Sequence, residues 1–289
     1  MTAYSDAYWW SSEGLRLHYR DYPADPAYAH RPPLLCLPGL TRNARDFESI
    51  ANRLSGQWRV ICPEYRGRGE SAHAKDAMSY VPLTYLQDLE RLFLDINLTR
   101  FVAIGTSLGG ILTMLMASTR PDRLAGALLN DIGPVLEEAG LNRIRSTTGN
   151  GSAQPTWMHA ARAVSENQKM NFPDYGIEDW LAMAKRLYRL NSAGRVVMDY
   201  DARIAEPFRV PGGEAGVDLW PTMAGFRNVP TLIVRGELSD LFSAATAERM
   251  LQEIGPSAEL VSVPRVGHAP TLDEPIAMAA LDRLLARIA

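Results

Sequence analysis

A serine set between glycines is the first feature of this chain that could support covalent chemistry. Residues 105–109 read Gly-Thr-Ser-Leu-Gly, which matches the pattern G-x-S-x-G, and Gly110 follows. An apolar run precedes the pattern and a helical stretch follows it at once, which is the strand–turn–helix setting of a nucleophile elbow. Such a turn strains the serine backbone and lifts the hydroxyl clear of the sheet, and only small residues such as Gly105 and Gly109 fit there. We therefore predict that Ser107 is a nucleophile.

A nucleophilic serine needs a general base, and five histidines are available. They are His18, His30, His73, His159 and His268. Only the last follows a late apolar run, between a glycine and an Ala-Pro pair, in a loop suited to presenting an imidazole over the edge of a sheet. We predict that His268 is the base.

The base in turn needs an orienting carboxylate, and two strand ends supply candidates. We favour Asp240, a few residues past the strand expected at 230–235. Its place gives the chain order serine, acid, histidine that is typical of this elbow, and its strand should lie beside the one that leads to His268. Asp131, after the preceding strand, is a rival that we interpret as a loop-capping carboxylate. Glu237 is a weaker rival on the loop of Asp240.

Short apolar runs alternate with amphipathic stretches over much of the chain. Runs that are apolar on both faces, as in strands of a parallel sheet, occupy 33–39, 58–66, 100–107, 124–134, 229–236 and 258–264. Helical spacing marks 44–54, 83–97, 108–124, 243–254 and 275–288. Two early β-like runs around Glu13-Gly14 predict a hairpin. This alternation predicts an α/β fold with a mostly parallel twisted sheet and helices on both faces.

The alternation stops between residues 135 and 226. Helical candidates there are 135–146, 156–170 and 177–190, and no buried strand is evident. Because this block falls between two strands of one sheet, we predict a core formed by 1–134 and 227–289, and a helical cap formed by 135–226. Most aromatic and methionine side chains of the cap should pack its own small core, and a few should line an apolar pocket over Ser107.

Together these motifs resemble the α/β-hydrolase fold superfamily, in the branch with a serine nucleophile and a helical cap after the sixth strand. The resemblance covers nearly the whole chain. It includes Leu-Pro-Gly-Leu at 37–40, after the first buried strand, and Arg-Gly-Arg-Gly-Glu-Ser at 66–71, after the second. It implies an oxyanion hole formed by the N–H groups of Leu40 and Leu108.

Two positions depart from the pattern of these relatives. Relatives usually have His where this chain has Pro38, and the donated N–H of Leu40 is unaffected by that change. They also carry Asp before the Arg-Gly turn, where this chain has Glu64-Tyr65. We interpret the turn as structural, with Arg66 and Ser71 bonding the backbone.

Serine at the elbow implies acyl chemistry at a carbonyl, since the dehalogenases and epoxide hydrolases of this superfamily use Asp there. The first expectation is a carboxylesterase-like hydrolase that cleaves small carboxylic esters or lactones through an acyl-enzyme. The second is a C–C bond hydrolase of aromatic ring-fission products. The third is a non-catalytic small-molecule receptor of the same fold.

The C–C hydrolase hypothesis requires a cation near the cap to pair with the carboxylate of the substrate. Four arginines are candidates by composition: Arg143, Arg145, Arg162 and Arg203. We interpret Lys185, Arg186 and Arg189 as part of a solvated helix face, and this interpretation favours the ester hypothesis.

Composition narrows the class of protein and its partners. The 289 residues are 46% hydrophobic and 22% charged, with a formal charge of −3, which is ordinary globular composition. No basic run suits nucleic acid, and no apolar stretch reaches the roughly 18–20 residues that span a bilayer. From the first ten residues we expect no secretory signal, and we interpret Cys36 and Cys62, which lie in apolar runs, as small hydrophobes. We expect a cytoplasmic protein with a small ester-like substrate, without cofactor, metal, nucleic-acid or membrane partner, and leave its oligomeric state open.

Overall fold

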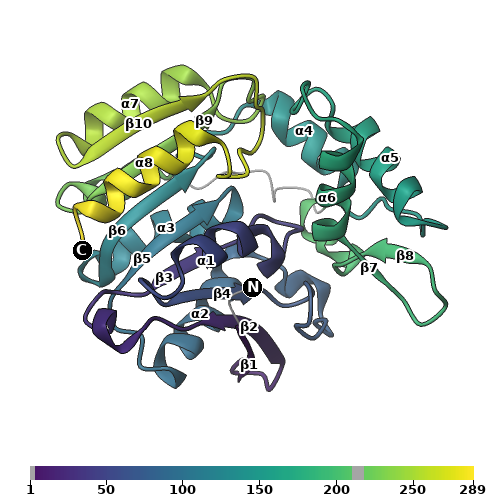
Figure 1. Ribbon diagram of the computed structural model, residues 1–289, viewed down its shortest axis with the longest axis horizontal. Coiled ribbons are helices and arrows are strands. Elements are labelled where there is room, and N and C mark those ends of the chain that lie inside the picture. The colour runs from purple at the N-terminus through teal and green to yellow at the C-terminus, as the bar shows by residue number, and fades with distance from the viewer. Residues whose placement is uncertain (1–3, 210–217) are drawn as a thin grey trace.

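A computed structural model describes residues 4–209 and 218–289, so residues 210–217 of the predicted cap lie outside it. In this part of the chain, eight strands form one sheet in the order β1-β2-β4-β3-β5-β6-β9-β10 (Figure 1). Their bounds are β1 Ser5–Trp10, β2 Arg16–Tyr22, β3 Leu34–Leu37, β4 Val60–Glu64, β5 Phe101–Thr106, β6 Leu124–Asn130, β9 Thr231–Gly236 and β10 Ala258–Val263. The strands β1 and β2 form the expected antiparallel hairpin, β2 also pairs antiparallel with β4, and the remaining pairs are parallel. The predicted α/β fold class is confirmed.

Helices cover both faces of the sheet, because its central strands are apolar on both sides. In β3, Leu34 and Cys36 face one hydrophobic layer and Leu35 and Leu37 face the other. The first layer is closed by α1 (Glu48–Leu54) and α8 (Pro275–Ala286), and the second by α2 (Pro82–Asp95), α3 (Leu108–Thr119) and α7 (Ala244–Ile254). Successive buried residues of the central strands thus face opposite helical layers, which hold the sheet between them.

Parallel pairing gathers the loops that carry the candidate residues. The strands β3, β5, β6, β9 and β10 run in one direction, so their carboxyl ends meet at a single edge of the sheet. The segments 38–47, 107, 131, 237–243 and 264–274 follow these ends. Ligands of open α/β sheets bind at this edge.

The chain between β6 and β9 contains the three predicted helices, α4 (Glu138–Thr147), α5 (Trp157–Gln168) and α6 (Ile177–Leu187). They lie together beyond the carboxyl edge of the sheet (Figure 1). A hairpin of β7 (Tyr188–Leu190) and β8 (Val196–Met198) was not expected, because strands of three residues are too short to show a periodic pattern. The segment η6 (Trp220–Phe226) belongs to the predicted cap, but it packs on α3 of the predicted core, where Gly225 adjoins the backbone of Ala117. The predicted boundaries at 134 and 227 stay a prediction.

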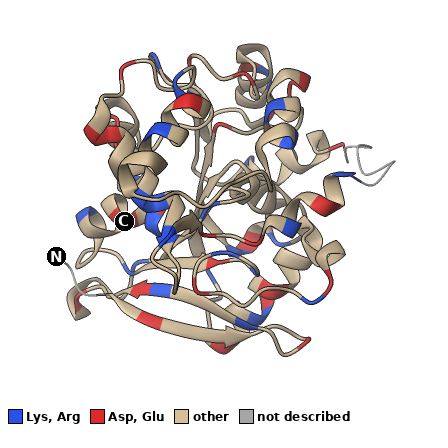
Figure 2. Cartoon of the chain, turned by 90° about the vertical axis from the view of Figure 1, so that its right-hand side faces the viewer, with Lys and Arg blue, Asp and Glu red and all other residues tan. Residues whose placement is uncertain are grey.

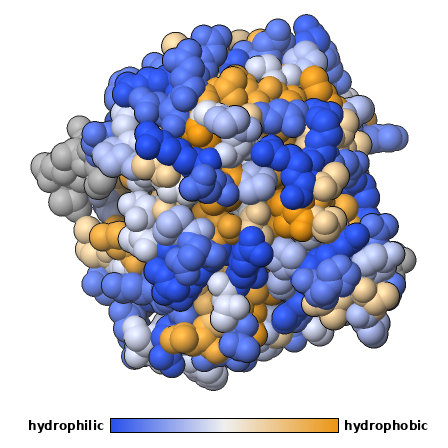
Figure 3. All heavy atoms as spheres, turned by 90° about the vertical axis from the view of Figure 1, so that its left-hand side faces the viewer, coloured by the Kyte–Doolittle hydropathy of each residue, from blue (hydrophilic) through white to orange (hydrophobic). Residues whose placement is uncertain are grey.

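On the face turned toward the viewer in Figure 2, basic and acidic residues are interspersed along the chain. The opposite face has several hydrophobic patches that hydrophilic residues separate (Figure 3). Cys36 and Cys62 are fully buried free thiols, and burial raises the pKa of Cys36. Within the described residues, no helix combines the length and apolarity needed to cross a bilayer.

Candidate active site

Ser107 lies in a sharp turn between β5 and α3. Its backbone has φ 52° and ψ −114°, a conformation that residues other than glycine rarely adopt. A Cβ on Gly105 would lie 2.5 Å from the backbone of Gly109, and a Cβ on Gly109 would overlap the backbone of Leu37. Close packing therefore requires both glycines, and the strained elbow predicted from the pattern is present.

Ser107 faces His268, which lies in the loop after β10. The serine Oγ and the imidazole Nε2 are 3.0 Å apart. On the other side of the ring, Nδ1 lies 2.7 Å from Oδ2 of Asp131. The imidazole thus joins a hydroxyl to a carboxylate, an arrangement in which it can take the serine proton while the acid fixes its orientation.

Asp131 directly follows β6 and is fully buried. Its Oδ1 accepts a hydrogen bond from the N–H of Gly236 at 2.7 Å, and its Oδ2 accepts one from the hydroxyl of Ser239 at 2.6 Å. These donors and the imidazole satisfy a carboxylate whose burial would otherwise be costly. They also fix the direction in which Asp131 presents its oxygen to His268.

The prediction that Asp240 orients His268 is wrong. Its carboxylate forms two hydrogen bonds with Arg143 of α4, at 2.6 and 2.7 Å. These bonds lower the pKa of Asp240, despite its partial burial. The weaker rival, Glu237, accepts a hydrogen bond from the N–H of Arg265. Asp131, which we interpreted as a loop-capping carboxylate, is instead the residue that contacts the imidazole.

The chain order could not separate the two aspartates, because both lie between Ser107 and His268, and the strands that they follow, β6 and β9, are adjacent and parallel. Both strands deliver the residues after their carboxyl ends to the same edge of the sheet. Beyond β9 the chain turns Ser239 toward Asp131, and the carbonyl of Asp240 then accepts from the N–H of Gly140 in α4. The side chain of Asp240 consequently faces a cap helix. A usable signal for Asp131 was its position directly after a strand, like that of Ser107.

The loop after β3 passes beside the elbow. A Cβ on Gly39 would lie 3.8 Å from Cβ of Ser107. Within the described residues, the N–H groups of Leu40 and Leu108 form no backbone hydrogen bond, so both can donate to a developing oxyanion. The oxyanion hole implied by the resemblance is compatible with this geometry, and its role in the reaction stays a prediction.

A buried arginine holds the Leu40 loop in place. The Nε of Arg68 donates to the carbonyl of Leu40 at 2.8 Å, and its Nη1 donates to the carbonyl of Arg66 at 2.7 Å. Three tyrosine rings surround the guanidinium at centroid distances of 4.7, 5.6 and 5.8 Å: Tyr85, Tyr80 and Tyr65. Sequence reasoning missed Arg68, although its place in the Arg-Gly-Arg-Gly turn was a usable signal.

The structural interpretation of this turn is half correct. The hydroxyl of Ser71 donates to the backbone carbonyl of Glu64 at 2.6 Å, as predicted. Arg66, however, forms two 2.8 Å hydrogen bonds with the carboxylate of Asp88 rather than with the backbone. Both side chains are buried, so the carboxylate of Asp88 compensates the charge of a guanidinium that has been removed from water.

Ser107 and His268 open into a cavity of about 350 Å³, lined by residues from the sheet edge and from the inserted segment. This volume suits a small-molecule ligand. Some of the apolar cap side chains line it, as predicted: Phe172, Met183, Met198 and their neighbours Val164 and Leu187. The substrate would therefore meet the nucleophile below a roof in which apolar and polar side chains are mixed.

Three arginines line the same cavity: Arg42, Arg143 and Arg186. The interpretation of Arg186 as part of a solvated helix face is wrong, since its side chain is only 21% exposed. Of the four cap arginines considered as carboxylate partners, the structure brings Arg143 to the cavity, whereas Arg145, Arg162 and Arg203 are not among its described lining residues. Asp46 is the one carboxylate in that described lining.

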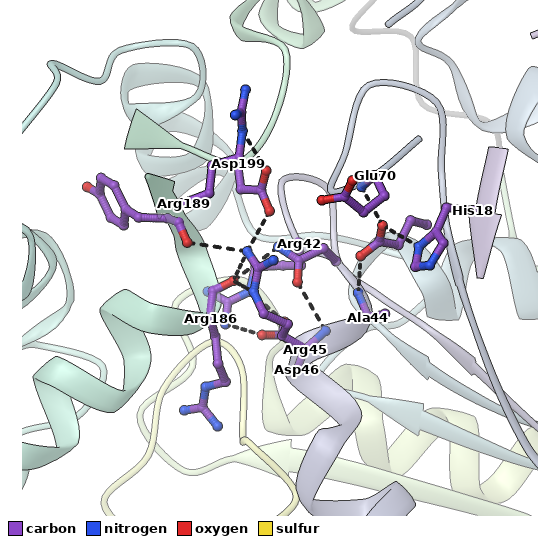
Figure 4. Close-up of polar contacts among 12 residues, drawn as sticks. His18, Arg42, Ala44, Arg45, Asp46, Glu70, Arg186, Arg189 and Asp199 are labelled. Carbon is purple, nitrogen blue, oxygen red and sulfur yellow. Dashed lines mark hydrogen bonds and ion pairs between the residues drawn. The ribbon is translucent and has the colours of Figure 1, made fainter. Parts of the chain in front are cut away.

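A network of polar contacts anchors the inserted segment to the sheet edge (Figure 4). The backbone carbonyl of Arg186, in the last turn of α6, accepts from Asn43 Nδ2 at 3.0 Å and from Arg45 Nε and Nη2 at 3.2 and 3.0 Å. Arg45 also pairs with the buried carboxylate of Asp199 at 2.6 Å, and Arg189 approaches the same carboxylate at 3.1 Å. These contacts satisfy the free end of α6 and fix the roof of the cavity.

Comparisons with known proteins agree with this fold. Residues 34–281 match the model of the alpha/beta hydrolase family. The crystal structure of an alpha/beta hydrolase from Novosphingobium aromaticivorans superposes with a TM-score of 0.94, at 56% sequence identity and 99% coverage of each chain.

Two curated relatives are hydrolases. The 3-hydroxybutyrate-oligomer hydrolase of Cupriavidus necator is 32% identical over 281 residues, which cover 93% of this chain and 92% of that protein. The 2-(acetamidomethylene)succinate hydrolase of Mesorhizobium japonicum is 28% identical over 239 residues, which cover 82% of this chain and 81% of that protein. The match over most of the chain and the serine elbow lead to one conclusion: this protein is a hydrolase that belongs to the alpha/beta hydrolase family.

Proposed function

We propose that this hydrolase cleaves small carboxylic esters through an acyl-enzyme on Ser107. The serine Oγ attacks the ester carbonyl while His268 Nε2 takes its proton, and the N–H groups of Leu40 and Leu108 bind the oxyanion. His268 then returns the proton to the leaving alcohol. Water, deprotonated by the same imidazole, attacks the acyl-serine and releases the carboxylic acid. Asp131 holds the ring in the required tautomer throughout.

One observation carries this proposal: His268 contacts Ser107 at 3.0 Å and Asp131 at 2.7 Å on opposite ring nitrogens. This geometry favours catalysis over a purely receptor role, because a receptor has no need for an aligned base and acid. The relative from Cupriavidus necator adds support, since oligomers of a hydroxy acid such as 3-hydroxybutyrate are joined by ester bonds. Lactones, which are cyclic esters, remain within the proposed substrate class.

A second candidate is hydrolysis of a C–C bond in a carboxylate-bearing ring-fission product. Arg186 in the cavity lining favours it, because such a substrate needs a cation beside its carboxylate. Measuring kcat/KM for a dienoate and for short aryl esters with one preparation separates the two. A dienoate value a hundredfold or more above the ester value would establish the second candidate and remove the first.

The nucleophile is tested by replacing Ser107 with Ala and following the hydrolysis of 4-nitrophenyl butyrate. Loss of the serine should reduce kcat by a factor on the order of 10⁶. The control is Ser152→Ala, at an exposed serine of the inserted segment, which should keep wild-type activity. A fluorophosphonate should label Ser107 at one equivalent per chain, and stoichiometric labelling at another serine would overturn the assignment.

A further inference from the structure

The three arginines of the cavity differ in their carboxylate partners. Arg42 forms two hydrogen bonds with Asp46, at 2.5 and 2.6 Å. Arg143 forms two with Asp240, at 2.6 and 2.7 Å. Each of these guanidinium groups is therefore engaged by a carboxylate on two of its nitrogens, and its charge is neutralised inside the protein.

Arg186 has no such partner. Its Nε is buried and forms no hydrogen bond within residues 4–209 and 218–289. Its Nη1 lies 3.7 Å from Oδ2 of Asp273, which is beyond hydrogen-bond distance. A buried donor without an acceptor costs free energy, because water has been removed and nothing replaces it. Unlike Arg42 and Arg143, Arg186 therefore lines the cavity with a partly exposed guanidinium that forms no hydrogen bond to a carboxylate of the described residues.

The backbone of Arg186 is held rigidly, so its side chain is directed before any ligand arrives. Its carbonyl accepts from Asn43 and from two nitrogens of Arg45. Figure 4 shows the side chain of Arg186 extending away from this network, with its guanidinium apart from Arg45 and Asp199. Fixing the last turn of α6 in this way reduces the entropy lost when a ligand binds the guanidinium.

We propose that Arg186 binds a free carboxylate of the substrate, so that this enzyme acts on esters that also carry a carboxylate group. The proposal rests on the ester hydrolysis proposed above. A guanidinium presents parallel N–H groups that match the two oxygens of a carboxylate. The same cavity contains Ser107, so the charged end and the ester carbonyl of one small molecule can be held together. The apolar side chains of the roof, such as Phe172 and Met183, can then contact the carbon chain between them.

Monomethyl glutarate and dimethyl glutarate test the proposal, because they differ only in the replacement of one ester by a carboxylate. Methanol release gives kcat/KM for each, and wild-type protein should prefer the monoester. In Arg186→Met the ratio of the two kcat/KM values should fall about ten- to hundredfold, which corresponds to loss of a hydrogen bond to a charged group. Arg186→Lys keeps the charge without the paired donors and should give an intermediate ratio.

Lys185→Met is the matched control, since Lys185 is exposed on the same helix and lies outside the described cavity lining. It removes the same charge one residue away and should leave the ratio unchanged. A ratio unaffected by Arg186→Met would overturn the proposal. An equal fall in both Met variants would also overturn it, because the effect would then be one of charge at a distance.

Binding to Ser107→Ala separates this proposal from the proposed function. Calorimetry should show that monomethyl glutarate binds at least about tenfold more weakly when Arg186→Met is added. If wild-type protein cleaves neither ester but this difference in Kd is present, the ester function fails and the carboxylate site stands. If both esters are cleaved and Arg186→Met changes neither the ratio nor the Kd, the carboxylate site fails and the ester function stands.

Discussion

The carboxylate of Asp131 lies 2.7 Å from Nδ1 of His268, although 137 positions separate the two residues in the chain. The acid comes from the end of β6 and the histidine from the loop after β10, with β9 between those strands in the sheet. Asp131 reaches across the end of β9 and is held there by the N–H of Gly236, the last residue of that strand. The contact therefore depends on the order of three neighbouring strands.

Replacing Asp131 with Asn should lower kcat by about 10⁴, because an amide would stabilise the wrong tautomer of His268. Replacing Asp240 with Asn should lower kcat by less than about tenfold, since its recorded partner is Arg143 rather than the imidazole. Steady-state kinetics on 4-nitrophenyl butyrate check both variants. The opposite ranking of the two kcat values would make Asp240 the acid.

Arg68 is a positioning residue whose removal should affect the reaction more than substrate binding. In Arg68→Met the carbonyl of Leu40 loses its 2.8 Å hydrogen bond, so the loop that carries the proposed oxyanion donor is less firmly held. We expect kcat to fall about tenfold or more with little change in KM, and partial rescue by Arg68→Lys. A rise in KM at constant kcat would show that Arg68 shapes the binding cavity instead.

Replacing Gly109 with Ala should destabilise the fold as well as the elbow. A Cβ there would overlap the backbone of Leu37 in β3, which flexible side chains cannot relieve. Overpacking of this kind costs about 1–3 kcal/mol of unfolding free energy, measured by urea denaturation. Gly176→Ala is the control, because a Cβ at that position would only touch Asp179 at 3.8 Å. Equal stability changes in the two variants would contradict the close-packing argument.

His18 should make the stability of the protein depend on pH. It is buried, with Nδ1 2.8 Å from Glu64 and Nε2 2.9 Å from Asp6. Burial lowers the pKa of His18, but hydrogen bonds and charge interactions with both carboxylates outweigh it, so the net pKa is raised above 6.5. A raised pKa means that the folded protein binds the proton more tightly than the unfolded chain does. This stabilisation is complete below pH 6.5 and is lost as the pH rises through the raised pKa.

Urea denaturation across that pH range measures the effect. The unfolding free energy of wild-type protein should fall with rising pH, and His18→Gln should remove most of this fall. His30→Gln is the control, because His30 is exposed. A wild-type slope that persists in His18→Gln would assign the titration to another group.

Much of the site was predictable because its signals are local. The glycines at 105 and 109 are required by the turn that carries Ser107, so their spacing indicates the tight geometry of that turn directly. Continuous apolar runs indicate strands that are covered on both faces, and helical spacing indicates the helices between them. His268 was identified for the same reason, since its loop directly follows a recognisable strand.

The choice of the acid and the place of Arg186 depended on the tertiary structure. Asp131 and Asp240 both follow strands that end at one edge, and only the path of the loop after β9 turns one toward His268 and the other toward Arg143. Arg186 has the sequence setting of an exposed helix residue, and it becomes a cavity residue because Asn43 and Arg45 hold the end of α6 against the sheet edge. Periodicity records which face of an element is apolar. It does not record which distant loop comes to lie against its polar face, because that is determined by packing among elements far apart in the chain.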